Sequence, residues 1–93
     1  MTTVLLLIAF SAVDLPGAES YLLGRAAERE AKYGEAFAAY TSCSDAGGPL
    51  VPYASERAAY CQSQGGNADE ALDTYRQLLE KHPEGPWVRM AEV

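Results

Sequence analysis

Hydrophobic residues recur with a helical period from Ala18 to the end of the chain, in segments separated by turn-forming residues. Glycine, asparagine and proline interrupt the pattern near Tyr33, between Gly47 and Pro52, between Gln64 and Asn67, and between Pro83 and Pro86. Apolar residues spaced three and four apart form one side of a helix, and such breaks end it. The pattern therefore predicts an all-α chain of four helices and a shorter fifth, with no strand from Ala18 to Val93.

Each predicted helix has an apolar side that we expect to be buried. Tyr40 and Tyr75 are assigned to the core, and Asn67 is placed to cap the fourth helix. In chain order, the apolar sides consist of Tyr21, Leu22, Leu23, Ala26, Ala27 and Ala31; of Ala36, Phe37, Ala39, Tyr40 and Cys43; of Ala54, Ala58 and Cys61; and of Leu72, Tyr75, Leu78 and Leu79.

The second pair of helices repeats the sequence pattern of the first. Gly34-Glu35-Ala36 followed by Tyr40 returns as Asp69-Glu70-Ala71 followed by Tyr75. A period in the middle thirties built from helix pairs is typical of a helical solenoid. The second helices align at a spacing of 35, whereas Gly24 and Ala58 in the first helices align at 34. We therefore expect one additional residue at Gly65-Gly66, in the turn of the second pair.

These positions resemble the tetratricopeptide repeat. That family has a small residue in its first helix, an alanine early in its second, an aromatic residue four positions later and a proline at its end. The resemblance covers about residues 20–83 and implies an antiparallel helix-pair solenoid of two repeats plus a partial third. In this chain the corresponding residues are Gly24 and Ala58, Ala36 and Ala71, Tyr40 and Tyr75, and Pro83.

Residues 52–93 also look like repeats of bacterial periplasmic assembly factors and the helical region of soluble lytic transglycosylases. In those proteins the helices form a scaffold, and peptidoglycan cleavage belongs to a separate domain. The resemblance implies a protein-interaction scaffold, and its alternative is a transglycosylase fragment without the catalytic domain. A second copy of this chain is a further candidate partner.

Residues 1–17 precede the repeat domain, which we place at residues 18–93. The run from Val4 to Val13 is apolar except for Ser11 and is too short to span a bilayer as a helix. It fits the hydrophobic part of a secretory signal peptide, which would place the protein in the periplasm or cell envelope. It equally fits a segment that packs on the first repeat, which leaves a cytoplasmic location open.

The net charge and the candidate catalytic and metal-binding residues limit the classes of function that we expect. Thirteen acidic and seven basic residues give a net charge of −6, which disfavours a nucleic acid partner. Glu19-Ser20 resembles the catalytic pair of transglycosylases, but the downstream segment of that family is missing. Cys43, Cys61 and His82 lie in three different predicted helices and lack metal-site spacing. We therefore expect no catalysis, no metal, no cofactor and no small-molecule substrate.

The two cysteines leave two interpretations open. Cys43 and Cys61 fall in helices expected to pack together, so a disulfide is one interpretation and two buried thiols are the other. We also expect Leu78, Leu79, Trp87, Val88 and Met90 to lack a covering helix, which favours oligomers. The predicted partner-binding surface lies on the first helices of the repeats and consists of Arg25, Glu28, Arg29, Glu56, Arg57, Tyr60 and Trp87.

Overall fold

The computed structural model describes the backbone of residues 15–91 and side chains through residue 88, and in that part the chain is all helical. The run from Val4 to Val13 lies outside the described residues. The helices are α2 (Ala18–Arg29), α3 (Tyr33–Asp45), α4 (Val51–Gln64), α5 (Ala68–Lys81) and α6 (Pro86–Ala91). From Ala18 to Ala91 the predicted helices and breaks are confirmed.

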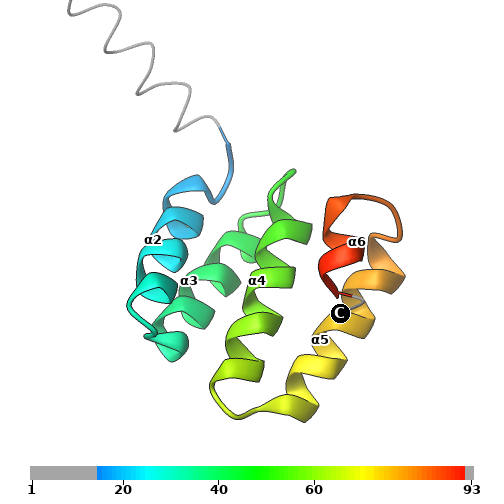
Figure 1. Ribbon diagram of the computed structural model, residues 1–93. Coiled ribbons are helices and arrows are strands. Elements are labelled where there is room, and N and C mark those ends of the chain that lie inside the picture. Colours follow the sequence, from blue (N-terminus) through cyan, green and yellow to red (C-terminus); the bar gives the residue numbers. More distant parts are fainter. Residues whose placement is uncertain (1–14, 92–93) are drawn as a thin grey trace, which may run out of the picture.

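Consecutive helices pack side by side in the order of the chain, as Figure 1 shows. Helix α3 contacts α2 and α4, α5 contacts α4, and α6 contacts both α4 and α5. Two antiparallel helix pairs, α2–α3 and α4–α5, therefore stack through α3 and α4. This arrangement is the predicted tetratricopeptide-like helical repeat.

Small residues allow the central helices to approach closely. Ala36, Ala54 and Ala58 belong to the buried core, together with Tyr40 at 0% exposure. Without long side chains at a crossing, two helix backbones come near enough for one large ring to fill the remaining space. The predicted burial of these alanines and of Tyr40 is confirmed.

The turns within the two helix pairs have the same length and backbone conformation. Ala31 has a φ of 59° and Gly66, 35 positions later, a φ of 90°. The amide of Lys32 donates to the carbonyl of Ala27 at 2.9 Å, and the amide of Asn67 donates to that of Gln62 at 2.8 Å. The expected extra residue at Gly65-Gly66 is therefore wrong, because the two turns match residue for residue at a spacing of 35.

Several residues assigned to buried sides are exposed. Leu22, Leu23 and Leu72 are 64%, 66% and 60% exposed, and Tyr75 is only half-buried. The apolar pattern identifies the amphipathic helix but not how many neighbours it has, and among the described residues α2 packs mainly on α3. Ala26 and Ala31 are also exposed, Ala31 lies beyond the end of α2, and Asn67 precedes α5 without a capping bond from its side chain.

The C-terminal segment covers part of the surface that we expected to remain open. Trp87 Nε1 donates to the carbonyl of His82 at 2.7 Å, and the Trp87 ring meets Tyr53 edge-on at 5.1 Å between centroids. Leu78 is 2% exposed, and Leu79 and Val88 are half-buried. The expectation of an uncovered C-terminal end is therefore wrong for these side chains, while that of Met90 lies outside the description.

Candidate functional site

The first helix of each pair, together with α6, forms a common surface that we call the A-helix face. Arg57 Nη1 of α4 lies 2.8 Å from Glu28 Oε2 of α2, and the edge-on contact between Tyr53 and Trp87 joins α4 to α6. These contacts connect side chains of α2, α4 and α6 directly. The sequence-predicted residues Arg25, Glu28, Arg29, Glu56, Arg57, Tyr60 and Trp87 all lie on these three helices.

Arg57 is held from several directions. Its Nε and Nη2 donate to the two carboxylate oxygens of Glu56 at 2.8 and 3.1 Å. Its guanidinium carbon lies 4.4 Å from the centre of the Tyr60 ring. Burial works against the charge of Arg57, but its hydrogen bond to Glu56 and the carboxylates of Glu56 and Glu28 outweigh this and raise its pKa. Charge-assisted forked bonds of this kind fix a side chain in one orientation.

Glu28 connects three helices through its carboxylate. Its Oε1 accepts a hydrogen bond from the hydroxyl of Tyr40 in α3 at 2.8 Å, and its Oε2 accepts from Arg57 in α4. Arg25, one turn earlier in α2, approaches the same oxygen at 3.7 Å. Burial and this hydrogen bond raise the pKa of Tyr40. The cluster therefore fixes the relative position of α2, α3 and α4 beneath the A-helix face.

Gly24 explains how Tyr40 reaches Glu28. A Cβ atom at Gly24 would lie 2.6 Å from Cε1 of the Tyr40 ring, closer than two carbon atoms can approach. Gly24 is itself buried. The missing side chain therefore leaves the space through which the Tyr40 ring crosses from α3 to the carboxylate on α2.

The structure places some predicted binding residues where a partner can touch them and others where it cannot. Glu56 is 3% exposed, so its prediction as an exposed binding residue is wrong: its carboxylate is enclosed beside Arg57. The side chains of Glu28 and Arg57 are 15% exposed, while that of Arg25 is 39% exposed.

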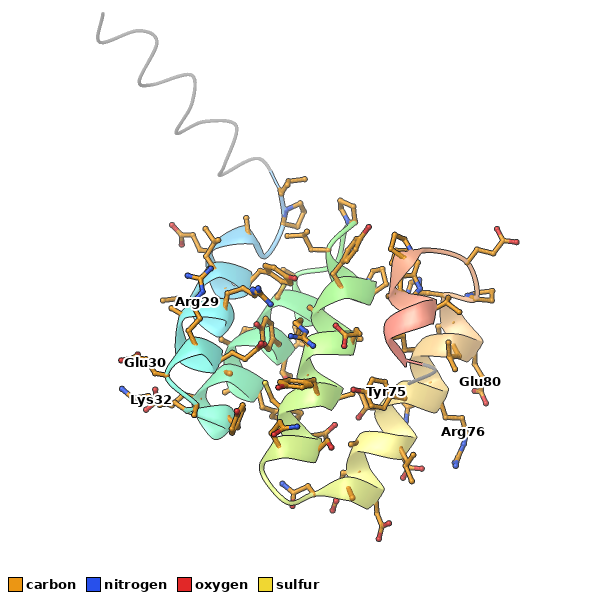
Figure 2. The ribbon with its side chains drawn as sticks, viewed as in Figure 1. Arg29, Glu30, Lys32, Tyr75, Arg76 and Glu80 are labelled. Atoms are coloured by element: carbon orange, nitrogen blue, oxygen red, sulfur yellow. The ribbon has the colours of Figure 1, made fainter. Side chains whose placement is uncertain are left out.

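The remaining predicted residues are more accessible. Arg29 is exposed, and Tyr60 and Trp87 are half-buried. Figure 2 shows Arg29 projecting at the end of α2, whereas Arg76 and Glu80 project from the outer side of α5. Among the described side chains of α2, α4 and α6, Arg29 and Arg25 are therefore the more exposed cations, and Arg57 is largely buried.

The polar connection from Tyr40 to Glu28 and Arg57 was not predicted from the sequence. The sequence pattern predicts the Tyr40 ring in the core, and it places Glu28 and Arg57 among the residues that we expect to be exposed. The available signal was the opposite charge of these two residues on helices expected to be neighbours.

Both cysteines are free and buried. Cys61 lies beside Tyr33 and Phe37, near the start of α3, whereas Cys43 lies in the last turn of that helix. Because α3 rises about 1.5 Å per residue, the two thiols lie near opposite ends of α3, beyond the ~7 Å limit for bonded Cα atoms. Of the two interpretations that the sequence left open, the structure has the two buried thiols and not the disulfide.

Burial raises the pKa of Cys43. Burial, together with Glu28, raises the pKa of Cys61 to about 11. Both thiols are therefore protonated and poorly nucleophilic at neutral pH.

Within residues 15–91, no cluster of three or more histidine, cysteine or acidic side chains is arranged to hold a metal ion. No helix of that part of the chain is both long and apolar enough to cross a membrane.

Comparison with known proteins identifies one family. A family model described as tetratricopeptide repeat matches residues 53–85, which comprise most of α4, all of α5 and the connection to α6. The match covers less than half of the chain and shows that this part is similar to the tetratricopeptide-repeat family. No curated protein and no solved structure matches the chain.

Proposed function

We propose that the protein is an interaction scaffold that binds another polypeptide on the A-helix face. The observation that carries the proposal is the preformed surface across α2, α4 and α6, with Arg57 fixed between Glu28 and Glu56. A surface ordered before binding loses little side-chain entropy when a partner arrives. The tetratricopeptide-repeat match supports a polypeptide as the partner.

The charges of this face favour an acidic segment in the partner. The carboxylates of Glu28 and Glu56 are engaged by Tyr40 and Arg57 and, at 3.7 Å, by Arg25. Arg29 is exposed, and the side chain of Arg25 remains 39% exposed beside this pair. Half-buried aromatic rings such as Tyr60 provide apolar contact area beside these cations. Although the whole chain is acidic, with a net charge of −6, this face therefore attracts negative side chains.

The alternative of a transglycosylase fragment has no support from the comparisons, and no residue cluster described above favours it. The absence of catalytic activity stays a prediction.

Selection of random displayed peptides against the full chain tests the proposal. We expect enriched peptides to contain acidic and aromatic residues. Their dissociation constant should rise about tenfold in the double variant Arg25→Ala/Arg29→Ala, because two solvent-exposed ion pairs together contribute about 1 to 2 kcal/mol.

Arg76→Ala is the matched control, since Arg76 is an exposed arginine on the outer side of α5 and pairs only locally with Asp73 at 3.1 Å. Peptides that bind equally well to the double variant, or that lose affinity equally in the control, would contradict the proposed site. A failure to enrich any peptide would contradict the proposed function.

A further inference from the structure

Helix α2 has a second apolar side, distinct from the side that packs on α3. Leu15 is 44% exposed and Leu23 is 66% exposed, and Ala26 is also exposed. A shallow hollow lies on this side beside Glu19, Leu22 and Leu23. We call Leu15, which lies just before α2, together with Glu19, Leu23 and Ala26 the open face of α2.

The two matching turns show which residues of α4 correspond to this face. Glu30 and Gly65 have nearly equal dihedral angles, with φ of −92° and −83° and ψ of 8° and 4°. Lys32 and Asn67 also agree, with φ of −89° and −105° and ψ of 71° and 61°. Residues of α2 and α4 therefore correspond at a spacing of 35.

At this spacing the open face of α2 corresponds to the side of α4 that packs on α3. The counterparts of Leu15, Glu19, Leu23 and Ala26 are Leu50, Ala54, Ala58 and Cys61. Ala54, Ala58 and Cys61 are 0%, 6% and 1% exposed and belong to the core shared with α3, against which Leu50 also packs. The open face of α2 therefore occupies the position at which a preceding second helix would pack.

We propose that residues 1–13 of the same chain cover the open face of α2, in the place that α3 takes on α4. The run from Val4 to Val13 contains no charged residue, and the four residues 14–17 connect it to α2. Four residues, 82–85, likewise connect α5 to α6, so this length suffices for a helix to turn back onto its predecessor.

The size of the open face favours this segment over a second copy. A helix of the length of α2, 12 residues, is about 18 Å long and about 10 Å wide. Such a strip is far smaller than the roughly 800 Å² per partner of a stable interface between separate proteins. A segment tethered by a short connection has an effective concentration on the order of millimolar, which compensates for the small area.

Thermal unfolding of single and double variants of the full chain tests the proposal. Leu23→Asp places a charge in the open face, and Leu7→Asp places one in the N-terminal run. Each should lower the Tm by about 10 °C, and the double variant should lie no lower than the single variants, because either charge alone already disrupts the same contact.

Leu72→Asp is the matched control, because Leu72 is also an exposed leucine within a helix, at 60% exposure, and it should change the Tm by no more than about 2 °C. Light scattering of every variant should show an unchanged monomer mass.

Three results would overturn the proposal. An effect of Leu23→Asp as small as that of Leu72→Asp would mean that the open face of α2 is not covered. A dimer that Leu23→Asp converts to a monomer would identify a second copy as the occupant. A mature chain that begins after Gly17, detected by mass spectrometry of the protein from its native cells, would identify the run as a cleaved signal peptide.

Discussion

The two helix pairs share one backbone turn but secure their second helices in different ways. In the first pair, Gly24 makes room for Tyr40, which is fully buried and bonds to Glu28. In the second pair, the equivalent positions are Ala59, Tyr75 and Ser63, and Tyr75 is half-buried. The first pair combines burial of the ring with a polar link from that ring to the A-helix face. In the second pair the polar link between the helices is made elsewhere, by the hydroxyl of Thr74 in α5, which donates to Gln62 Oε1 in α4 at 2.7 Å.

The difference follows from the neighbours of each ring. The Tyr40 ring belongs to the core that α3 shares with α4, and it lies against Gly24 of α2. It also meets the Tyr21 ring edge-on, at 5.5 Å between centroids. Tyr75 lies between α4 and α5, as Figure 2 shows, and the helix that follows α5, α6, has only 6 residues. A repeated sequence position therefore has different energetic importance depending on whether full-length helices enclose it on both sides.

The largest expected effect distinguishes the two tyrosines. Tyr40→Ala should lower the free energy of unfolding by about 4 kcal/mol, since it removes a fully buried ring and leaves an acceptor of Glu28 unpaired. Tyr75→Ala should cost about 2 kcal/mol, because its ring is already partly in water. Urea unfolding measures both values. Equal costs would show that the polar link and the deeper burial of Tyr40 do not matter for stability.

The second prediction concerns the small residue that faces each ring. Gly24→Ala should lower the free energy of unfolding by about 2 kcal/mol, because the new Cβ would meet the Tyr40 ring at 2.6 Å. Ala59→Gly, the reciprocal change in α4, should cost only about 1 kcal/mol, from the lower helix propensity of glycine. A Gly24→Ala variant that is as stable as the parent would mean that Tyr40 moves aside without loss.

The third prediction concerns the pH dependence of stability that the buried thiol of Cys61 produces. The pKa of Cys61 rises from the ordinary thiol value of 9.0 to about 11 in the folded protein. Its contribution to stability is therefore complete below about pH 9 and is lost as the pH rises through 11, by up to about 3 kcal/mol in total. Urea unfolding between pH 8 and about pH 9.5, where most tyrosines of the unfolded chain are still protonated, should show the start of this decline.

The variant Cys61→Ala provides the comparison for this prediction. It should remove the share of this decline that Cys61 contributes between pH 8 and about pH 9.5, because no thiol then remains at this position to ionise in the unfolded chain. Cys43, whose pKa is also raised by burial, keeps its own share. The parent and Cys61→Ala would have parallel pH profiles if the buried thiol had an ordinary pKa in the folded state.

The sequence predicted the helices and most of the core because both depend on local pattern. Ala36 and Tyr40 were placed correctly since their spacing fits a helix and their size fits a crossing. The 34-residue alignment of the first helices failed because Ala58 and Ala59 are adjacent, and both are buried in a helix with neighbours on two sides. Only the backbone of the turns shows that Ala59 is the counterpart of Gly24.

The binding face was less predictable, because exposure depends on contacts between helices. Glu56 looks like a surface residue in the sequence, but the fork of Arg57 holds its carboxylate in a buried position. Leu22 and Leu23 look like core residues, but their burial depends on what lies beyond the first pair. Periodicity gives the orientation of a side chain around its own helix and does not give the element on the other side.

The smallest expected effect concerns the turns within the two helix pairs. Each turn contains one residue in the left-handed region, and this residue is alanine in the first pair and glycine in the second. Ala31 adopts a φ of 59°, and Gly66 occupies the same position in the second pair with a φ of 90°. A residue with a Cβ atom is strained there by about 1 kcal/mol or more, whereas glycine is not, although glycine leaves the unfolded chain with more freedom.

Ala31→Gly should therefore raise the free energy of unfolding by about 0.5 kcal/mol. Gly66→Ala should lower it by about 1 kcal/mol, and nothing within 4 Å of a Cβ atom at Gly66 would add a clash. Urea unfolding of both variants beside the parent measures these opposite changes. Two changes of the same sign would mean that the turns differ in strain despite their matching backbone angles.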